Sequence, residues 1–114
     1  MIQIYGRKKC ADTRKAVRFF KERRIPVQQV DVDQKAPGAR EIELFVTVLG
    51  PEAVVDASSG EYQKRGLAYI DFDAAEELAE HPQLLRTPIV RRGRDLVCGA
   101  DEAGWSRIAE DERP

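Results

Sequence analysis

The chain has few of the side chains that a metal site or a disulfide framework needs. It contains two cysteines and one histidine in 114 residues, and these do not have the spacing of zinc ligands. We therefore expect no metal site. Two cysteines would allow one disulfide, but a cytosolic chain of this length does not need one. In such a chain a cysteine is more often buried filler, a metal ligand or a reactive thiol.

Other features are missing as well. No apolar run approaches the roughly 20 residues of a membrane span, and the short apolar N-terminal stretch followed by charges is unlike a signal peptide. The net charge is −1, so nothing indicates direct binding to nucleic acid. Internal repeats and low-complexity tracts are also missing. We expect one cytoplasmic domain over residues 1–114, without a membrane segment, and a monomer.

What the chain does have is enough apolar material for a core, because 42% of its residues are hydrophobic and 34% are charged. Residues 2–5, "IQIY", alternate as in a strand, and Gly6 ends the pattern. Helical spacing follows from Ala11 to about Arg23. Residues 27–32, "VQQVDV", indicate a second strand. The short links predict a βαβ unit with parallel strands.

The middle of the sequence favours helices. We expect helices at 39–49, 51–55, 61–66 and 73–81. Gly50 and Pro51 separate the first two, Asp73 is a candidate N-cap of the last, and Pro82 should end it. Helical segments thus occupy about 38–85.

The clearest hairpin lies near the C-terminus. Residues 88–90 and 95–98 predict its two strands, with Arg92 and Gly93 in the turn. A last helix should follow from about Asp101. The order is therefore β-α-β, several short helices, and β-β-α.

This order resembles the thioredoxin fold, and the helices between its halves are similar to those of the arsenate reductase-like (ArsC/Spx) family. The stretches that carry the resemblance are "YGRKKCADTRKAVRFF", "LGPEAVVD", "EYQKRGLA" and "LLRTPIV…VCGADE". The resemblance implies an α/β, thioredoxin-like fold. Its four-stranded mixed sheet would have a helical segment inserted between the βαβ and ββα halves.

Cys10 is the candidate catalytic nucleophile. A thiolate is the reactive form, and an ordinary thiol is mostly protonated at pH 7. A position at a helix N-terminus favours the thiolate, and the positive charges of Lys8, Lys9 and Arg14 do so too. The alternative is a small buried side chain, which the charged neighbours argue against. In "CADT" the place of a second cysteine is taken by Thr13, whose hydroxyl could donate to the sulfur.

Because Thr13 cannot form a disulfide, another thiol must resolve an oxidised Cys10. Glutathione, thioredoxin, a partner protein or Cys98 could supply it. In the thioredoxin order Cys98 lies about two strands from Cys10, or nearly 10 Å at ~4.8 Å per strand. That exceeds the ~7 Å limit for an unforced disulfide, so a bridge would require movement. The alternative role for Cys98 is core packing.

The resemblance also implies substrate-binding residues. Pro88 would be a cis-proline that faces Cys10, and Thr87 would offer backbone groups to an extended substrate such as the cysteinyl part of glutathione. Pro88 could instead be an ordinary strand-start proline. The segment "CGADE" resembles the glutathione-binding segment of glutaredoxins, which makes Gly99 and Asp101 candidates. The alternative for Asp101 is a favourable acid at a helix N-terminus.

Arsenate reductases of this family use three arginines to hold the oxyanion. The corresponding positions here are Ala57 or Ser58, Thr87 and Gly99. Arg65 and Arg86 are near these positions, but a shift of one residue along a strand reverses the side-chain direction. Lys9 and Arg86 remain candidate substrate-binding residues, and surface exposure is the alternative for each arginine.

Three functions remain open. The first is a glutaredoxin-like thiol-disulfide oxidoreductase with no bound cofactor, which uses glutathione as co-substrate and glutaredoxin, thioredoxin or a protein disulfide as partner. The second is an Spx-like regulator that binds the RNA polymerase α subunit, although the Cys-x-x-Cys switch of those proteins is absent. The third is glutathione-dependent arsenate reduction. The basic face formed by Arg14, Lys15, Arg18 and Lys21 is either solvated or a surface for a protein partner.

Overall fold

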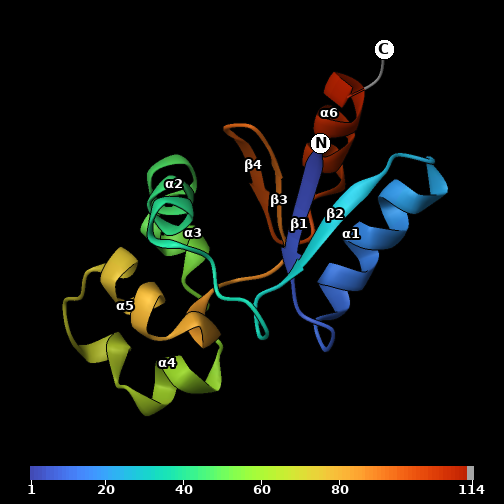
Figure 1. Ribbon diagram of the computed structural model, residues 1–114. Helices are drawn as coiled ribbons and strands as arrows, with labels where there is room; N and C mark the ends of the chain where they lie inside the picture. The colour runs from blue at the N-terminus through green and yellow to red at the C-terminus, as the bar shows by residue number, and fades with distance from the viewer. Residues whose placement is uncertain (113–114) are drawn as a thin grey trace.

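A computed structural model, which describes residues 1–112, contains one four-stranded mixed sheet (Figure 1). The strand order is β2-β1-β3-β4. The β1–β2 pair is parallel, whereas the β1–β3 and β3–β4 pairs are antiparallel. The α/β, thioredoxin-like arrangement that the sequence predicts is thereby confirmed. The strands are β1 (Ile2–Gly6), β2 (Val27–Asp31), β3 (Ile89–Arg92) and β4 (Asp95–Cys98).

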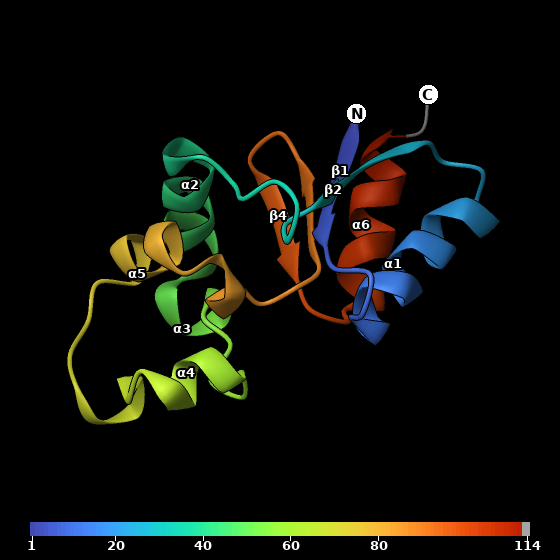
Figure 2. The same cartoon turned by 60° about the horizontal axis from the view of Figure 1, so that its bottom comes forward.

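Two helices cover one face of the sheet (Figure 2). They are α1 (Ala11–Glu22) and α6 (Glu102–Glu112). The ring centroids of Phe19 and Trp105 lie 5.5 Å apart and join the two helices. Val17 is only half-buried, although its spacing placed it on the inner face. The core of this side includes Ile2, Ile4, Ala16, Phe20, Val90 and Ile108.

The inserted helices cover the opposite face (Figures 1 and 2). They are α2 (Ala39–Leu49), α3 (Pro51–Val54), α4 (Gly60–Lys64) and α5 (Ala74–Glu80), with short 3₁₀ turns η1 (Leu67–Tyr69) and η2 (Pro82–Leu84). Tyr5 points to this side, where its ring lies 5.0 Å from that of Phe45. Asp73 caps α5 as expected, because its carboxylate accepts the N–H of Glu76 at 3.0 Å.

Two boundaries differ from the expected ones. The first strand of the hairpin begins at Ile89 and continues to Arg92, which pairs with Asp95. The turn is therefore Gly93-Arg94, and Gly93 has the positive φ of 63° that such a tight turn favours. Helix α5 ends at Glu80, before Pro82. Pro82 opens the 3₁₀ turn η2, because a proline fits the first position of a helical turn.

The insertion is closed at its base by a short antiparallel bridge between Val55 and Leu85. The N–H of Asp56 donates to the Leu84 carbonyl at 2.7 Å, and the N–H of Arg86 donates to the Val54 carbonyl at 2.8 Å. The bridge fixes the segment that leads into β3. No helix within residues 1–112 combines the length and apolar character needed to cross a membrane.

Candidate active site around Cys10

The turn between β1 and α1 places Cys10 at the N-cap of α1. The Cys10 N–H donates to the Arg7 carbonyl at 3.1 Å, which closes the turn. Gly6 is needed because Thr13 packs against it: a Cβ on residue 6 would lie 2.2 Å from Thr13 Cγ2. The helix therefore starts close to the end of the strand, with the thiol at its N-terminus.

The Cys10 sulfur is half-buried and lies beside the segment that precedes β3. The thiol is positioned to donate to the Thr87 carbonyl, with 3.5 Å between Sγ and the oxygen. Burial raises the pKa of Cys10, but hydrogen bonds from the Thr13 and Thr87 side chains and the N–H groups of Thr13 and Asp12 outweigh it. The net pKa lies below the ordinary thiol value, in the direction that favours a thiolate.

The basic residues around Cys10 are arranged differently from the acid-lowering box that their spacing suggested. Lys8 and Lys9 are exposed, and Arg14 donates to the Lys8 carbonyl at 2.8 Å. The groups that most lower the pKa of Cys10 are hydrogen-bond donors at the start of α1 and at Thr87. The local geometry of the helix N-terminus thus contributes more than side-chain charge.

Arg7 is the residue of this region that the sequence patterns did not single out. Its guanidinium donates to the carbonyls of Pro82 and Leu85, both at 2.6 Å, and contacts Thr87 Oγ1 at 3.4 Å. It also pairs with Asp33 at 2.9 Å. Only 17% of its side chain is exposed. Arg7 therefore ties the turn that carries Cys10 to the segment that carries Thr87.

The peptide bond between Thr87 and Pro88 is cis, as the resemblance implied. The N–H of Gly99 donates to the Pro88 carbonyl at 2.9 Å, and Gly99 has a positive φ of 79°. Asp101 caps α6, because its carboxylate accepts the N–H of Gly104 at 3.0 Å. Thr87 thus lies next to Cys10, and Gly99 is joined to Pro88.

Cys98 lies on β4, two strands away from β1 in the sheet, as expected. Both cysteines are free thiols. Cys98 Sγ is 3.6 Å from the Ala53 carbonyl and 4.0 Å from the Arg86 carbonyl. Burial raises its pKa to about 11, although the Arg86 charge acts in the opposite direction. Cys98 is therefore protonated and poorly nucleophilic at neutral pH.

The two arginines that might replace the missing oxyanion ligands have other partners. Arg86 Nε donates to the Ala53 carbonyl at 3.0 Å, which directs it toward α3 and Cys98. Arg65 forms a two-pronged ion pair with Glu77 at 2.9 and 3.0 Å. Neither side chain has a contact with Cys10 among the residues that the structure describes.

A group of potential metal ligands lies on α5, away from the cysteines. Ligand-type atoms of Glu77, Glu80 and His81 lie within 4.8 Å of one another. Both Glu77 oxygens already accept bonds from Arg65, and His81 Nδ1 is 3.5 Å from Glu61. The group is therefore an ion-pair network on the insertion, with its strongest potential ligand already occupied.

A thioredoxin-like fold with one cysteine at the start of its first helix, beside the segment before β3, defines the class to which this protein belongs. The profile of the ArsC family matches residues 5–108. The chain therefore belongs to the ArsC family.

Known relatives fall into groups with different names. The chain is 27% identical over 107 residues to the global transcriptional regulator Spx of Enterococcus faecalis, and the match covers 90% of this chain and 81% of that protein. A solved structure named YffB protein matches with a TM-score of 0.85 and 17% identity, over 94% of this chain and 97% of the other. An arsenate reductase from Vibrio cholerae matches with a TM-score of 0.76 and 20% identity, over 96% and 95%. At these identities the two structures show the fold alone.

Proposed function

We propose that this protein is a thiol-disulfide oxidoreductase in which Cys10 is the only attacking thiol. The observation that carries the proposal is the position of Cys10 Sγ, at the start of α1 and 3.5 Å from the Thr87 carbonyl. Hydrogen-bond donors there lower the thiol pKa. A lowered pKa raises the thiolate fraction at neutral pH, and the thiolate is the attacking form.

The proposed reaction is a pair of thiol-disulfide exchanges. The Cys10 thiolate attacks one sulfur of a substrate disulfide, a mixed disulfide forms, and the other substrate sulfur leaves as a thiolate. A thiol of glutathione, glutaredoxin or thioredoxin then attacks the mixed disulfide and releases Cys10. Two thiols are oxidised to one disulfide for each substrate disulfide that is reduced. Thr13 offers no second sulfur, which is why the resolving thiol comes from outside.

Glutathione is the co-substrate that we propose, and no bound cofactor is required. Thr87 is placed to contact an extended peptide next to Cys10, and the exposed ammonium of Lys9 is available to a carboxylate. Gly99 is hydrogen-bonded to Pro88, so the loop that ends in Asp101 lies next to the same segment. We propose these residues as the glutathione contacts.

Mass spectrometry after treatment with oxidised glutathione tests the proposal. We expect one glutathione on Cys10 in the wild type and in Cys98→Ser, and none in Cys10→Ser. The pH dependence of alkylation by iodoacetamide should place the pKa of Cys10 below the ordinary value. Failure to form the adduct on Cys10, together with an ordinary thiol pKa, would overturn the proposal.

The second candidate is a regulator that binds RNA polymerase, and the similarity to the Enterococcus faecalis Spx protein favours it. Pull-down with the purified C-terminal domain of the polymerase α subunit tests this function. Binding that survives in Cys10→Ser would support a regulator that acts without thiol chemistry. Failure to retain the domain would exclude it.

Arsenate reduction is the third candidate, favoured by the family alone. Its weakness is the set of oxyanion ligands, since Arg65 and Arg86 are bonded elsewhere. Arginine forks are the groups best suited to hold such an anion beside a thiolate. An arsenate turnover assay coupled to glutathione reductase decides the question, and we expect no turnover above that of Cys10→Ser.

A further inference from the structure

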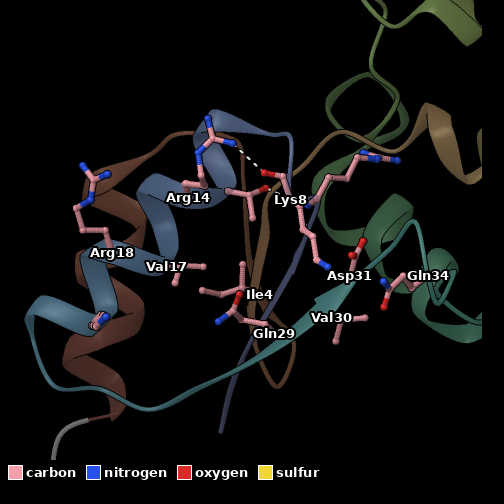
Figure 3. A pocket seen from close by; sticks show the side chains of 13 residues that line it. Ile4, Lys8, Arg14, Val17, Arg18, Gln29, Val30, Asp31 and Gln34 are labelled. Carbon is pink, nitrogen blue, oxygen red and sulfur yellow. Dashed lines mark hydrogen bonds between the residues drawn. The ribbon is translucent and has the colours of Figure 1, made fainter.

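Strand β2 forms one edge of the sheet, and the molecule is hollow on both sides of it. On the α1 side a groove of about 600 Å³ separates α1 from β2, as Figure 3 shows. On the opposite side a hollow of about 300 Å³ lies between β2 and the loop at 34–37. Gln29, Val30 and Asp31 line both spaces. The outer edge of β2 is therefore accessible together with a space on each face.

The backbone of β2 presents unpaired groups along this edge. The N–H of Val32 donates inward to the Gly6 carbonyl at 3.0 Å. Because peptide groups alternate along a strand, those of Val30 and Gln28 also face β1. The N–H and carbonyl groups of Val27 and Gln29 then face away from the sheet. Within residues 1–112, β2 pairs only with β1, so these groups are a template for another strand.

The groove on the α1 side has an apolar floor and a cationic rim. Ile4 and Val17 contribute to the floor. Lys8, Arg18 and Lys21 stand on the rim. No hydrogen bond or ion pair formed among the described residues involves these three charged groups.

The acid in the groove does not neutralise this rim. Asp31 Oδ1 accepts the N–H of Asp33 at 3.0 Å, which leaves the rim with an excess of positive charge. The hollow on the other face is lined by uncharged groups, among them Gln3, Gln28 and Pro37, and by the charged residues Lys35 and Glu41. An occupant of both spaces should therefore be acidic toward α1 and small and uncharged on the other side.

We propose that the open edge of β2 is a binding site for an extended acidic peptide, which adds to the sheet beside Val27 and Gln29. Side chains of an added strand alternate between the two faces. Acidic side chains would enter the groove toward Arg18 and Lys21, and small apolar ones would enter the opposite hollow. A second copy of this chain fits less well, because its β2 offers Gln28 and Gln29 and its α1 repeats the same positive charges. This site goes beyond the thiol chemistry proposed for Cys10.

The experiment uses the full chain and a short capped peptide in which glutamate alternates with valine, followed by NMR. We expect shifts at β2 and α1, and slower hydrogen exchange at the amides of Val27 and Gln29, which only strand addition produces. Gln29→Pro removes an outward N–H and not a bond to β1, so the fold should persist and binding should weaken about tenfold or more. Higher salt should weaken binding as well.

Charge controls separate the groove from net charge. The double variant Arg18→Glu/Lys21→Glu should bind the peptide at least about tenfold more weakly. The matched variant Lys64→Glu/Arg94→Glu changes the net charge equally at exposed positions outside both spaces. It should bind within about twofold of the wild type. A peptide in which lysine alternates with valine should not bind.

Four results would overturn the proposal. One is absence of binding by the wild type at millimolar peptide. Another is binding that shifts α1 signals while the Gln29 amide exchanges as before, because the groove would then hold a ligand without strand addition. A third is equal loss of binding in the two double variants. The last is a protected Gln29 amide in the free protein that becomes exposed on dilution, since a second copy would then occupy the edge.

Discussion

Replacement of Arg7 by alanine should destabilise the protein by about 3 kcal/mol. A hydrogen bond to a charged group contributes roughly 1.5–3 kcal/mol when it is shielded from water. Arg7 makes two such bonds at 2.6 Å, to Leu85 and Pro82. The Pro82 carbonyl also accepts the N–H of Leu85, so its loss is partial. The pair with Asp33, whose side chain is 55% exposed, adds at most about 1 kcal/mol.

Urea unfolding followed by circular dichroism measures this change. At about 4 °C per kcal/mol for a domain of this size, the melting temperature should fall by about 12 °C. Arg7→Lys keeps the charge but not the planar fork, and we expect an intermediate loss. Lys15→Ala is the matched control, because Lys15 is 63% exposed and makes only a 3.8 Å contact with Asp12. It should change the free energy of unfolding by less than about 0.5 kcal/mol.

The same variant should also alter the thiol. Arg7 holds the segment that carries Thr87, and the Thr87 hydrogen bond lowers the pKa of Cys10. Arg7→Ala should therefore raise the pKa of Cys10, and alkylation by iodoacetamide should require a higher pH than in the wild type. The reasoning would be refuted if Arg7→Ala and Lys15→Ala unfolded at the same urea concentration.

Further predictions concern the second cysteine and two backbone positions. Folded Cys98 has a pKa of about 11 against an ordinary 9.0, so the unfolded chain loses this proton first. Stability should fall as pH rises from about 9 to about 11, and Cys98→Ala should remove that part of the slope in urea titrations. Gly6→Ala should cost about 1–3 kcal/mol because of its contact with Thr13; adding Thr13→Ala should recover part of this in a double-mutant cycle, and additive losses would contradict the contact. Arg24 has a φ of 58°, so Arg24→Gly should raise the free energy of unfolding by up to about 1 kcal/mol, and a loss would count against backbone strain.

Much of the architecture could be predicted because it depends on short-range patterns. The alternation in "IQIY" and the helical spacing after Ala11 are local, and β1 and α1 follow them. Asp73 caps α5 through a bond to a residue three positions later. The hairpin turn was misplaced by one residue, because strand register depends on pairing partners as well as on composition.

The candidate site was less predictable because its contacts are distant in sequence. The proximity of Cys10 and Thr87 came from the family resemblance, and their contact spans the whole insertion. Arg7 has backbone carbonyls as partners, and a carbonyl leaves no mark on the amino-acid sequence. Its position after Gly6 resembled one more charge in a basic run. The edge of β2 was missed for a similar reason, since vacancy beside a strand depends on strand order.

The short bridge between Val55 and Leu85 has a consequence for folding order. Tyr5 pairs with Ile89, so the sheet closes across the insertion. The entropy of closing a flexible loop of that length is roughly 4 kcal/mol, from the logarithmic dependence on loop length. An insertion that has already joined its own base at the bridge shortens the chain that remains to be closed. We therefore expect β3 to dock on β1 only after the inserted helices have formed, which makes completion of the Cys10 site a late event in folding.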